Sequence, residues 1–297
     1  MYYAADSHFF LDGKFLPASE VRIDPLSQTL HYGNGVFDGL RAYRTVQGPK
    51  IFKARAHFER FAEAAALMSL PLNFSVDDLI NISYDLLERN RLNDAYIRPL
   101  LFAPANMTLA PTPQKSHLLI GAFQWGKLLG NNLVNLQISA RRKPEPADLP
   151  IEGKICGLYV NNILATTEAR AQGFNEALML DHQGYVVQSA GANLFIEKGE
   201  RLYTPPKGNI MPGITRETVM EMAGEMGILV TEQHITPEFL FEADGAFLAG
   251  TAVELTGVAT VDRKPLQLAW QDSIGYLLSR KYRQIVTHAE RFKWTVI

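Results

Sequence analysis

One lysine of this sequence has surroundings that suit chemistry. Lys154 lies among glycines and apolar residues in the segment IEGKICGLYVNNIL, residues 151–164, just before a stretch that predicts a helix. A lysine amine that is held in a semi-apolar pocket can act as a nucleophile and form a Schiff base with a carbonyl compound. The alternative is an ordinary surface lysine, whose alkyl chain covers apolar surface while its charge stays in water.

Pyridoxal phosphate is one carbonyl compound that such a lysine can bind. Its phosphate needs backbone N–H groups at a helix N-terminus, hydroxyl groups and an arginine. Gly213-Ile214-Thr215 opens a predicted helix, and Thr251 follows an apolar run. Each feature is common on its own, and Arg55 and Arg60, near the start of another predicted helix, are also typical of surface ion pairs. The residues alone therefore leave the phosphate site open.

The composition excludes several other functions. The chain has 297 residues, 47% of them hydrophobic, and a net charge of −2, which supplies no basic surface for nucleic acid. No apolar run approaches the roughly 20 residues that a membrane helix needs. The seven histidines are never two or four residues apart, so we expect no metal site of ordinary spacing. The single cysteine, Cys156, and the absence of a signal-peptide pattern predict a cytoplasmic protein.

Alternating strand and helix patterns predict an α/β (α+β) chain. Near the N-terminus we expect a hairpin that turns at Asp12-Gly13, an amphipathic helix in ARAHFERFAEAAALMSL and a helix that begins with a Ser75–Asp78 capping box. KPEPADLP, residues 143–150, has three prolines and is typical of an extended linker. The end of the chain predicts another amphipathic helix. We therefore expect a small α/β domain at 1–125, a linker at 126–150 and a larger cofactor-binding domain at 151–297.

Strings along most of the chain resemble one enzyme family. They are LHYGNGVFDGLRAY (30–43), AYIRPLLF (95–102), FQWG (123–126), the stretch from GKICGLYVNNIL to LMLDHQGYV (153–186), AGANLF (190–195), YTPP (203–206), MPGITRE (211–217) and AGTAVELTGV (249–258). In this order they resemble the fold-type IV, or class IV, pyridoxal phosphate aminotransferases, and most closely the branched-chain amino acid aminotransferases. The resemblance implies two lobes with the cofactor in a cleft between them.

The resemblance also implies roles for the residues that would hold the cofactor. Lys154 matches the lysine that forms the Schiff base and moves the proton between the substrate Cα and the cofactor. Tyr159 matches the tyrosine that hydrogen-bonds the phenolic oxygen of the cofactor. The residues that match the phosphate-binding set are Arg55, Thr215 and Thr251, with the backbone amides of Ile214 and Thr215.

Another set of matching residues would bind the substrates, a small-molecule amino acid and a 2-oxo acid. Tyr96 and the backbone at Thr251-Ala252 match the residues that hold the α-carboxylate. Arg98 matches the arginine that receives the distal carboxylate of glutamate or 2-oxoglutarate. The matching walls of the side-chain pocket are Phe37, Trp125 and Tyr32, the last on a loop that comes from the partner subunit in the family. The resemblance therefore implies a homodimer or a higher homo-oligomer.

The sequence departs from the family pattern at the pyridine nitrogen. The family has a glutamate there, whereas this chain has Gln188 in QSAGANLF (188–195), and Ala192 stands where a second glutamate is usual. A carboxylate keeps the ring nitrogen protonated, but a neutral amide can instead donate a hydrogen bond to an unprotonated nitrogen. We therefore expect slower removal of the Cα proton. Leu128 replaces a tyrosine that is common in branched-chain enzymes, which leaves the acceptor preference open.

We expect a transaminase that moves the amino group between branched-chain or related apolar L-amino acids and 2-oxoglutarate by a ping-pong mechanism. One alternative is a lyase similar to aminodeoxychorismate lyase, but the strings around Arg98 and Trp125 favour the transaminase. Another alternative is a paralogue that binds pyridoxal phosphate with reduced or no transaminase activity. Gln188 is the only residue that supports this last alternative.

Overall fold

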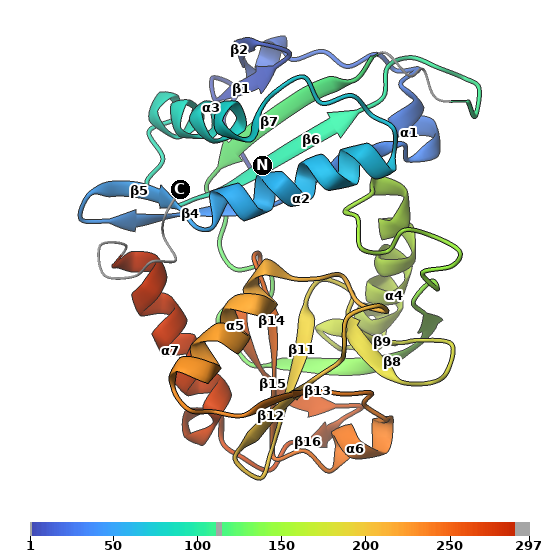
Figure 1. The fold of residues 1–297 in the computed structure, drawn as a ribbon, viewed down its shortest axis with the longest axis vertical. Coiled ribbons are helices and arrows are strands. Elements are labelled where there is room, and N and C mark those ends of the chain that lie inside the picture. Colours follow the sequence, from blue (N-terminus) through green and yellow to red (C-terminus); the bar gives the residue numbers. More distant parts are fainter. Residues whose placement is uncertain (1, 111–114, 289–297) are drawn as a thin grey trace. The chain divides into compact units, whose positions relative to one another are not determined.

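The computed structural model of this chain describes residues 2–110 and 115–288. The chain forms two compact units (Figure 1). The first holds the described residues up to Gly126, Gly153–Leu158 and those from Ile285, and the second holds Lys127–Glu152 and Tyr159–Gln284. Both units mix helices and strands, which confirms the predicted α/β class. In the part that is described, no helix is long and apolar enough to cross a membrane.

The first unit contains an antiparallel sheet of seven strands. Its order is β2-β1-β7-β6-β4-β5, and β3 also pairs with β6. The predicted hairpin is confirmed, because β1 and β2 pair around Asp12-Gly13, which both adopt the positive φ that such a turn requires. The strands are β1 (His8–Leu11), β2 (Lys14–Pro17), β3 (Gly35–Phe37), β4 (Leu40–Thr45), β5 (Gly48–Ile51), β6 (Ala95–Phe102) and β7 (His117–Phe123).

Two helices, α2 (Ala54–Leu67) and α3 (Val76–Arg89), lie side by side on one face of this sheet (Figure 1). The predicted capping box is confirmed at the start of α3. Ser75 Oγ accepts the Asp78 N–H, and the Asp78 carboxylate accepts the Ser75 N–H. Shorter helical segments are η1 (Ala18–Glu20), α1 (Gln28–Tyr32) and η2 (Cys156–Leu158).

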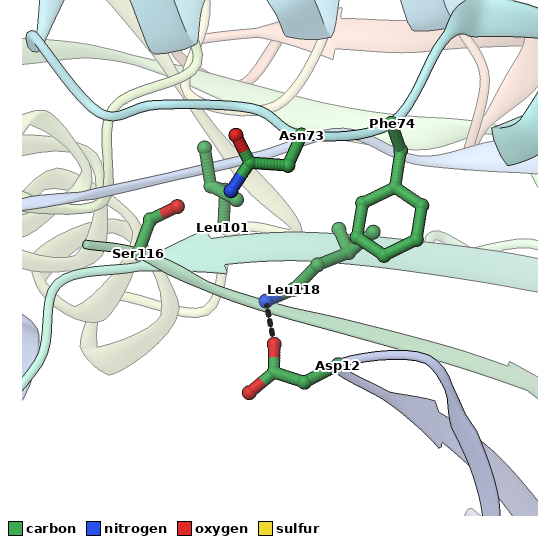
Figure 2. Close-up of a pocket in the computed structure, with 6 residues that line it drawn as sticks. All are labelled: Asp12, Asn73, Phe74, Leu101, Ser116 and Leu118. Carbon is green, nitrogen blue, oxygen red and sulfur yellow. Dashed lines mark hydrogen bonds between the residues drawn. The ribbon is translucent and has the colours of Figure 1, made fainter. Parts of the chain in front are cut away.

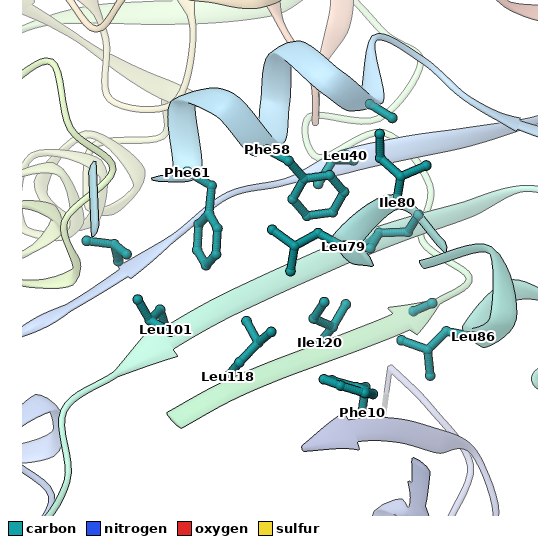
Figure 3. Close-up of a cluster of buried hydrophobic side chains, with 14 of the residues drawn as sticks. Phe10, Leu40, Phe58, Phe61, Leu79, Ile80, Leu86, Leu101, Leu118 and Ile120 are labelled. Carbon is teal, nitrogen blue, oxygen red and sulfur yellow. The ribbon is translucent and has the colours of Figure 1, made fainter. Parts of the chain in front are cut away.

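The core of the first unit lies between these helices and the sheet. Figure 3 shows Phe58 and Phe61 of α2 pointing into a cluster with Leu79 of α3 and Leu118 and Ile120 of β7. Both phenylalanines are fully buried, as their spacing on one helix face predicts. Burial of each such side chain contributes about 1.5–3 kcal/mol. This packing holds the sheet strands in place, including β3 and β6, on which several candidate site residues lie.

The second unit contains a nine-stranded mixed sheet. Its order is β10-β9-β8-β15-β14-β11-β12-β13, and an additional β10–β11 pairing closes the path from β10 to β11 into a ring. The strands are β8 (Val134–Arg142), β9 (Glu176–Leu180), β10 (Val186–Ser189), β11 (Asn193–Lys198), β12 (Arg201–Thr204), β13 (Val230–Glu232), β14 (Gly245–Gly250), β15 (Glu254–Val261) and β16 (Lys264–Pro265). The helical segments are α4 (Tyr159–Ala171), α5 (Ile214–Glu225), α6 (Pro237–Phe241), η3 (Trp270–Asp272) and α7 (Ile274–Thr287).

Two segments differ from the sequence-based division. Residues 126–150, predicted as a linker, contain β8, which pairs with both β9 and β15. Residues 153–158, predicted with the larger domain, group with the first unit because Ile155 forms a bridge with Val36 and the Gly157 N–H donates to Gly33. The predicted C-terminal amphipathic helix is present as α7, and its expected continuation at 289–297 lies outside the described residues.

Candidate active-site residues

Lys154 is held against the end of β3 in the first unit. Its carbonyl oxygen accepts the Phe37 N–H at 3.0 Å, and its half-buried side chain places Nζ 5.6 Å from the centroid of the Phe37 ring. The next residue, Ile155, is buried in the core of the same unit. The backbone at Lys154 is therefore fixed, and its amine lies near an aromatic face. Such surroundings are those that the glycines and apolar residues around Lys154 in the sequence predict.

A cation among aromatic rings lies beside this lysine. Tyr96 and Arg98 are two residues apart on β6 and therefore lie on the same face of the strand. An Arg98 N–H donates to Tyr96 Oη at 3.1 Å. The Arg98 guanidinium carbon is 4.7 Å from the Phe37 ring centroid. The Trp125 ring packs edge-on against Tyr96, with centroids 4.7 Å apart. The structure thus brings together five predicted residues: Phe37, Tyr96, Arg98, Trp125 and Lys154.

Arg98 has unused hydrogen-bonding capacity in this group. Its Nε is buried and has no hydrogen-bond partner among the described residues. A buried donor without a partner costs about 1–3 kcal/mol. A guanidinium group with a spare N–H matches the geometry of a carboxylate, so this arrangement suits a ligand with a carboxylate group.

Two other predicted residues of the first unit have more exposed surroundings. The Arg55 guanidinium pairs with Asp77 at 2.5 Å, and the two side chains are 44% and 70% exposed. Such an exposed pair contributes at most about 1 kcal/mol, so a phosphate could displace Asp77 at little cost. Tyr32 is 47% exposed, and its hydroxyl donates to the Met107 carbonyl at 3.2 Å. Both side chains are therefore open to solvent, unlike the buried Tyr96.

In the second unit, Gln188 is buried and its amide is oriented by the backbone. Its Oε1 accepts the Met211 N–H at 2.7 Å, and its Nε2 donates to the Ser189 carbonyl at 3.2 Å. An N–H only donates and a carbonyl only accepts, so these two partners fix which end of the amide is oxygen. A carboxylate in the same position would place one of its oxygens against the Ser189 carbonyl oxygen. Both groups only accept hydrogen bonds, so they would repel each other. The surroundings of Gln188 therefore suit an amide.

The remaining predicted residues of the second unit lie at helix and strand ends. Tyr159 is the first residue of α4, and Ile214 and Thr215 open α5. A Cβ on Gly213, the residue that caps α5, would lie 2.1 Å from Asn193 Oδ1, so any other residue there would displace the Asn193 side chain. Thr251 and Ala252 follow β14, and the Ala252 carbonyl accepts the Leu128 N–H at 2.9 Å. A helix N-terminus and threonine hydroxyls are groups that bind phosphate.

Sequence reasoning missed a buried charged cluster in the first unit. Arg60, which the sequence suggested as a surface residue, has a side chain only 12% exposed and pairs with Asp38, whose side chain is fully buried. His57 also contacts Asp38, at 2.9 Å. The spacing of His57 and Arg60, three residues apart on α2, places both on one helix face and was the available signal.

Burial also raises the pKa of two groups, Glu176 and Cys156. Burial raises the pKa of the Glu176 carboxyl, although the Ala177 N–H and the Thr166 hydroxyl donate to it and oppose the change. Burial likewise raises the pKa of the Cys156 thiol, two residues after Lys154, against the opposing charge of Arg98. Cys156 is therefore a thiol at neutral pH and a poor nucleophile.

One shallow hollow of the first unit is lined by other residues. It has a volume of about 260 Å³ and is lined by Asp12, Asn73, Phe74, Leu101, Ser116 and Leu118 (Figure 2). Asp12 Oδ1 accepts the Leu118 N–H at 2.8 Å, which closes one side of it. The lining contains none of the predicted site residues. In the described parts of the chain, no group of three or more His, Cys, Asp or Glu side chains could hold a metal ion.

Comparison with known proteins gives consistent matches over most of the chain. The amino-transferase class IV family matches residues 35–261. The branched-chain-amino-acid aminotransferase of Salmonella typhimurium is 36% identical over 262 residues, which cover 86% of this chain and 85% of that protein. The Escherichia coli branched-chain amino acid aminotransferase structure matches with a TM-score of 0.93 at 32% identity, covering 97% and 98% of the two chains.

A related structure contains a derivative of the expected cofactor. It is a branched-chain amino acid aminotransferase from the organism abbreviated T.th., complexed with N-(5'-phosphopyridoxyl)-L-glutamate. It matches with a TM-score of 0.92 at 32% identity and covers 97% of each chain. The ligand of that enzyme joins a pyridoxal phosphate skeleton to glutamate.

Proposed function

This chain belongs to the class IV aminotransferases and is a pyridoxal phosphate-dependent transaminase, and from that premise we propose that it exchanges the amino group between branched-chain L-amino acids and 2-oxoglutarate. The observation that supports this substrate pair best is Arg98, a cation among the Phe37, Tyr96 and Trp125 rings. Apolar walls suit leucine, and the spare Arg98 N–H suits the distal carboxylate of glutamate.

We propose which residues hold pyridoxal phosphate at its aldehyde and at its phosphate. Bound pyridoxal phosphate supplies an aldehyde that takes up the amino group and a ring that accepts electrons from the substrate Cα. Lys154 would hold the aldehyde carbon, and the Tyr159 hydroxyl would donate to the phenolic oxygen. The groups that we propose for the phosphate are the Thr215 and Thr251 hydroxyls, the amides of Ile214 and Thr215 at the start of α5, and Arg55.

The same residues have distinct tasks in the reaction. Lys154 Nζ would take the proton from the substrate Cα and would deliver it to the carbon that receives the amino group. Tyr96 Oη accepts a hydrogen bond from Arg98, so its own proton is available for the substrate α-carboxylate. The backbone at Thr251-Ala252 would hold the other carboxylate oxygen. Phe37 and Trp125 keep water from the substrate side chain.

Gln188 would lie at the ring nitrogen and make this enzyme differ from its relatives. Gln188 Oε1 already accepts the Met211 N–H, and one N–H of Nε2 donates to the Ser189 carbonyl. The second N–H of Nε2 can therefore be offered to the ring nitrogen. That bond favours an unprotonated nitrogen and a weaker electron sink. We therefore propose that turnover is slower than with a glutamate. The lyase alternative is not favoured, because the relatives that match over most of the chain are aminotransferases.

We also propose that the chain is a cytoplasmic homodimer. Large apolar side chains are exposed just before α1, along α1 and in the segment that follows β6: Leu26, Leu30, Tyr32, Met107 and Leu109. Backbone and side-chain hydrogen bonds join the two segments, with the Asn106 N–H donating to Leu26 and Gln28 donating to Thr108. An apolar surface of this kind is typical of a contact with a second copy. Sedimentation at assay concentrations should give twice the 33.2 kDa chain mass.

Steady-state kinetics test the proposed reaction. With pyridoxal phosphate bound, we measure initial rates at varied L-leucine and at several fixed concentrations of 2-oxoglutarate. We expect the double-reciprocal plots to be parallel lines, because the first product leaves before the second substrate binds. D-alanine with the same acceptor should give no rate. A rate with D-alanine that matches the rate with L-leucine, or intersecting lines, would contradict the proposal.

A further inference from the structure

A buried carboxylate lies at the end of the turn for which we propose a role in binding the substrate α-carboxylate. Residues 251–253 form this turn between β14 and β15, and Gly250 and Glu254 pair across it. The Glu254 side chain is only 4% exposed, and its Oε2 pairs with Lys127 Nζ at 3.0 Å. Arg283 of α7 approaches the other carboxylate oxygen at 3.6 Å. The buried charge of Glu254 therefore has cations beside it, as a buried charge requires.

Lys127 and the residue after it hold this turn at two places. Lys127 pairs with Glu254 at the end of the turn, and the Leu128 N–H donates to the Ala252 carbonyl at 2.9 Å in the middle of the turn. All four residues belong to the second unit. Because the two contacts come from adjacent residues, the ion pair and the backbone hydrogen bond together restrict the main chain at 251–252.

The end of β14, just before the turn, packs closely on another loop. A Cβ on Gly250 would lie 3.3 Å from Ala192 Cβ and 3.5 Å from the Gly191 carbonyl oxygen. A Cβ on Gly191 would in turn lie 3.8 Å from Leu128 Cδ2. The three segments that carry these residues therefore pack against one another, so a movement of one displaces the others.

The backbone of Glu254 has a conformation that glutamate rarely adopts. Its φ is 54°, in the left-handed region, where any side chain with a Cβ costs free energy. Glycine suits such a position at the end of a short hairpin turn. A buried ion pair also adds little net stability, because removing both charges from water offsets their attraction. The stability of the hairpin alone therefore does not account for a glutamate at this position.

We propose that Glu254 is a positioning residue for the substrate α-carboxylate and that it acts through its ion pair with Lys127. The pair holds the turn in one conformation, and with it the main chain at Thr251 and Ala252 that would bind the carboxylate. This inference rests on the proposed function of those two residues. An error of about 1 Å in the position of a bound substrate can cost roughly 100-fold in rate, so a small displacement of the turn is enough to matter.

The test is the Glu254→Met protein, which keeps the length of the side chain and removes its charge. We expect it to fold, because the Lys127 side chain is 30% exposed and its charge stays in water. At saturating pyridoxal phosphate, kcat/KM should fall about 10- to 100-fold, by the same factor for L-leucine and L-glutamate, because both have the α-carboxylate. The Kd of 4-methylvaleric acid, which has a carboxylate but no amino group, should rise by a similar factor.

Two further variants show whether the ion pair carries the effect. Lys127→Arg keeps the cation and should retain most of kcat/KM. Glu242→Met is the matched control, because it removes the carboxylate of another Lys–Glu pair of the second unit, with Lys198 at 2.7 Å. It should leave both kcat/KM and the Kd of the acid unchanged. Thermal unfolding of each variant checks that it is folded at the assay temperature.

The double variant Glu254→Met, Lys127→Met completes the test. If it loses no more kcat/KM than Glu254→Met, the two residues act as a pair and the inference is supported. If its loss is the product of the two single losses, or if Glu254→Met has the wild-type kcat/KM and Kd, the inference is wrong. A wild-type protein that binds the cofactor but transfers no amino group would contradict the proposed function instead, and the Kd of 4-methylvaleric acid would still test Glu254.

Discussion

Replacement of Lys154 with alanine should abolish transamination. We expect Lys154→Ala to lower kcat on the order of 10⁴-fold or more, because the proposed mechanism uses this amine both to hold the aldehyde carbon of the cofactor and to move the Cα proton. The visible absorbance of the protein-bound cofactor should also change to that of the free aldehyde. Rates with L-leucine and 2-oxoglutarate, with spectra of the same samples, measure both effects.

The control for this prediction is Lys14→Ala, which removes an exposed lysine from β2 in the same unit. It should keep the wild-type rate and spectrum. Borohydride reduction of the wild type, followed by peptide mapping, should place the covalent cofactor on Lys154. Attachment at another lysine, or a Lys154→Ala protein with a rate close to that of the wild type, would refute the role of this residue.

Arg98→Gln should separate the two substrate classes. In the proposed function Arg98 makes a charge-assisted hydrogen bond to the distal carboxylate, worth about 1.5–3 kcal/mol, so its loss should lower kcat/KM for L-glutamate roughly 10- to 150-fold. L-leucine has no distal carboxylate, and its kcat/KM should change little. The measurement is kcat/KM for L-leucine divided by kcat/KM for L-glutamate, and this ratio should rise by about the same factor.

Arg89→Gln is a matched control for Arg98→Gln. Arg89 also lies over a phenylalanine, with its guanidinium carbon 4.3 Å from the Phe15 ring centroid. Its loss removes the same charge and the same kind of aromatic contact but should leave the ratio of the two kcat/KM values unchanged. Equal losses for glutamate and leucine in Arg98→Gln would mean that Arg98 only supports Tyr96, to which it donates a hydrogen bond.

Local patterns in the sequence predict those elements whose conformation is set by residues close together in the chain. Asp12-Gly13 supplies the positive φ values that a hairpin needs. Phe58 and Phe61 recur on one helix face and are buried in the core as expected. Gly227, just after α5, has a φ of 72°, a conformation that glycine favours at the end of a helix.

Contacts between distant residues could not be predicted in this way. The three prolines of 143–150 suggested a linker around them, yet residues 134–142 form β8, because their partners are strands near residues 176 and 258. The pairing of Asp38 with Arg60 joins residues 22 apart, and the spacing of His57 and Arg60 indicates only that they share a helix face, not that a buried carboxylate lies against that face. Among the site residues, the sequence shows that Gln188 departs from the family pattern. It does not show the hydrogen bonds with the Met211 N–H and the Ser189 carbonyl, which favour an amide at this position.

The most direct test of the proposed transamination is a half-reaction. The purified protein with bound pyridoxal phosphate is mixed with L-leucine or L-glutamate, with no 2-oxo acid present, and its visible spectrum is recorded. The account predicts that the band of the bound aldehyde form converts to that of pyridoxamine phosphate, at a slow but measurable rate because of Gln188. A band that both amino acids leave unchanged would show that the protein binds the cofactor without transferring the amino group, and would contradict the account.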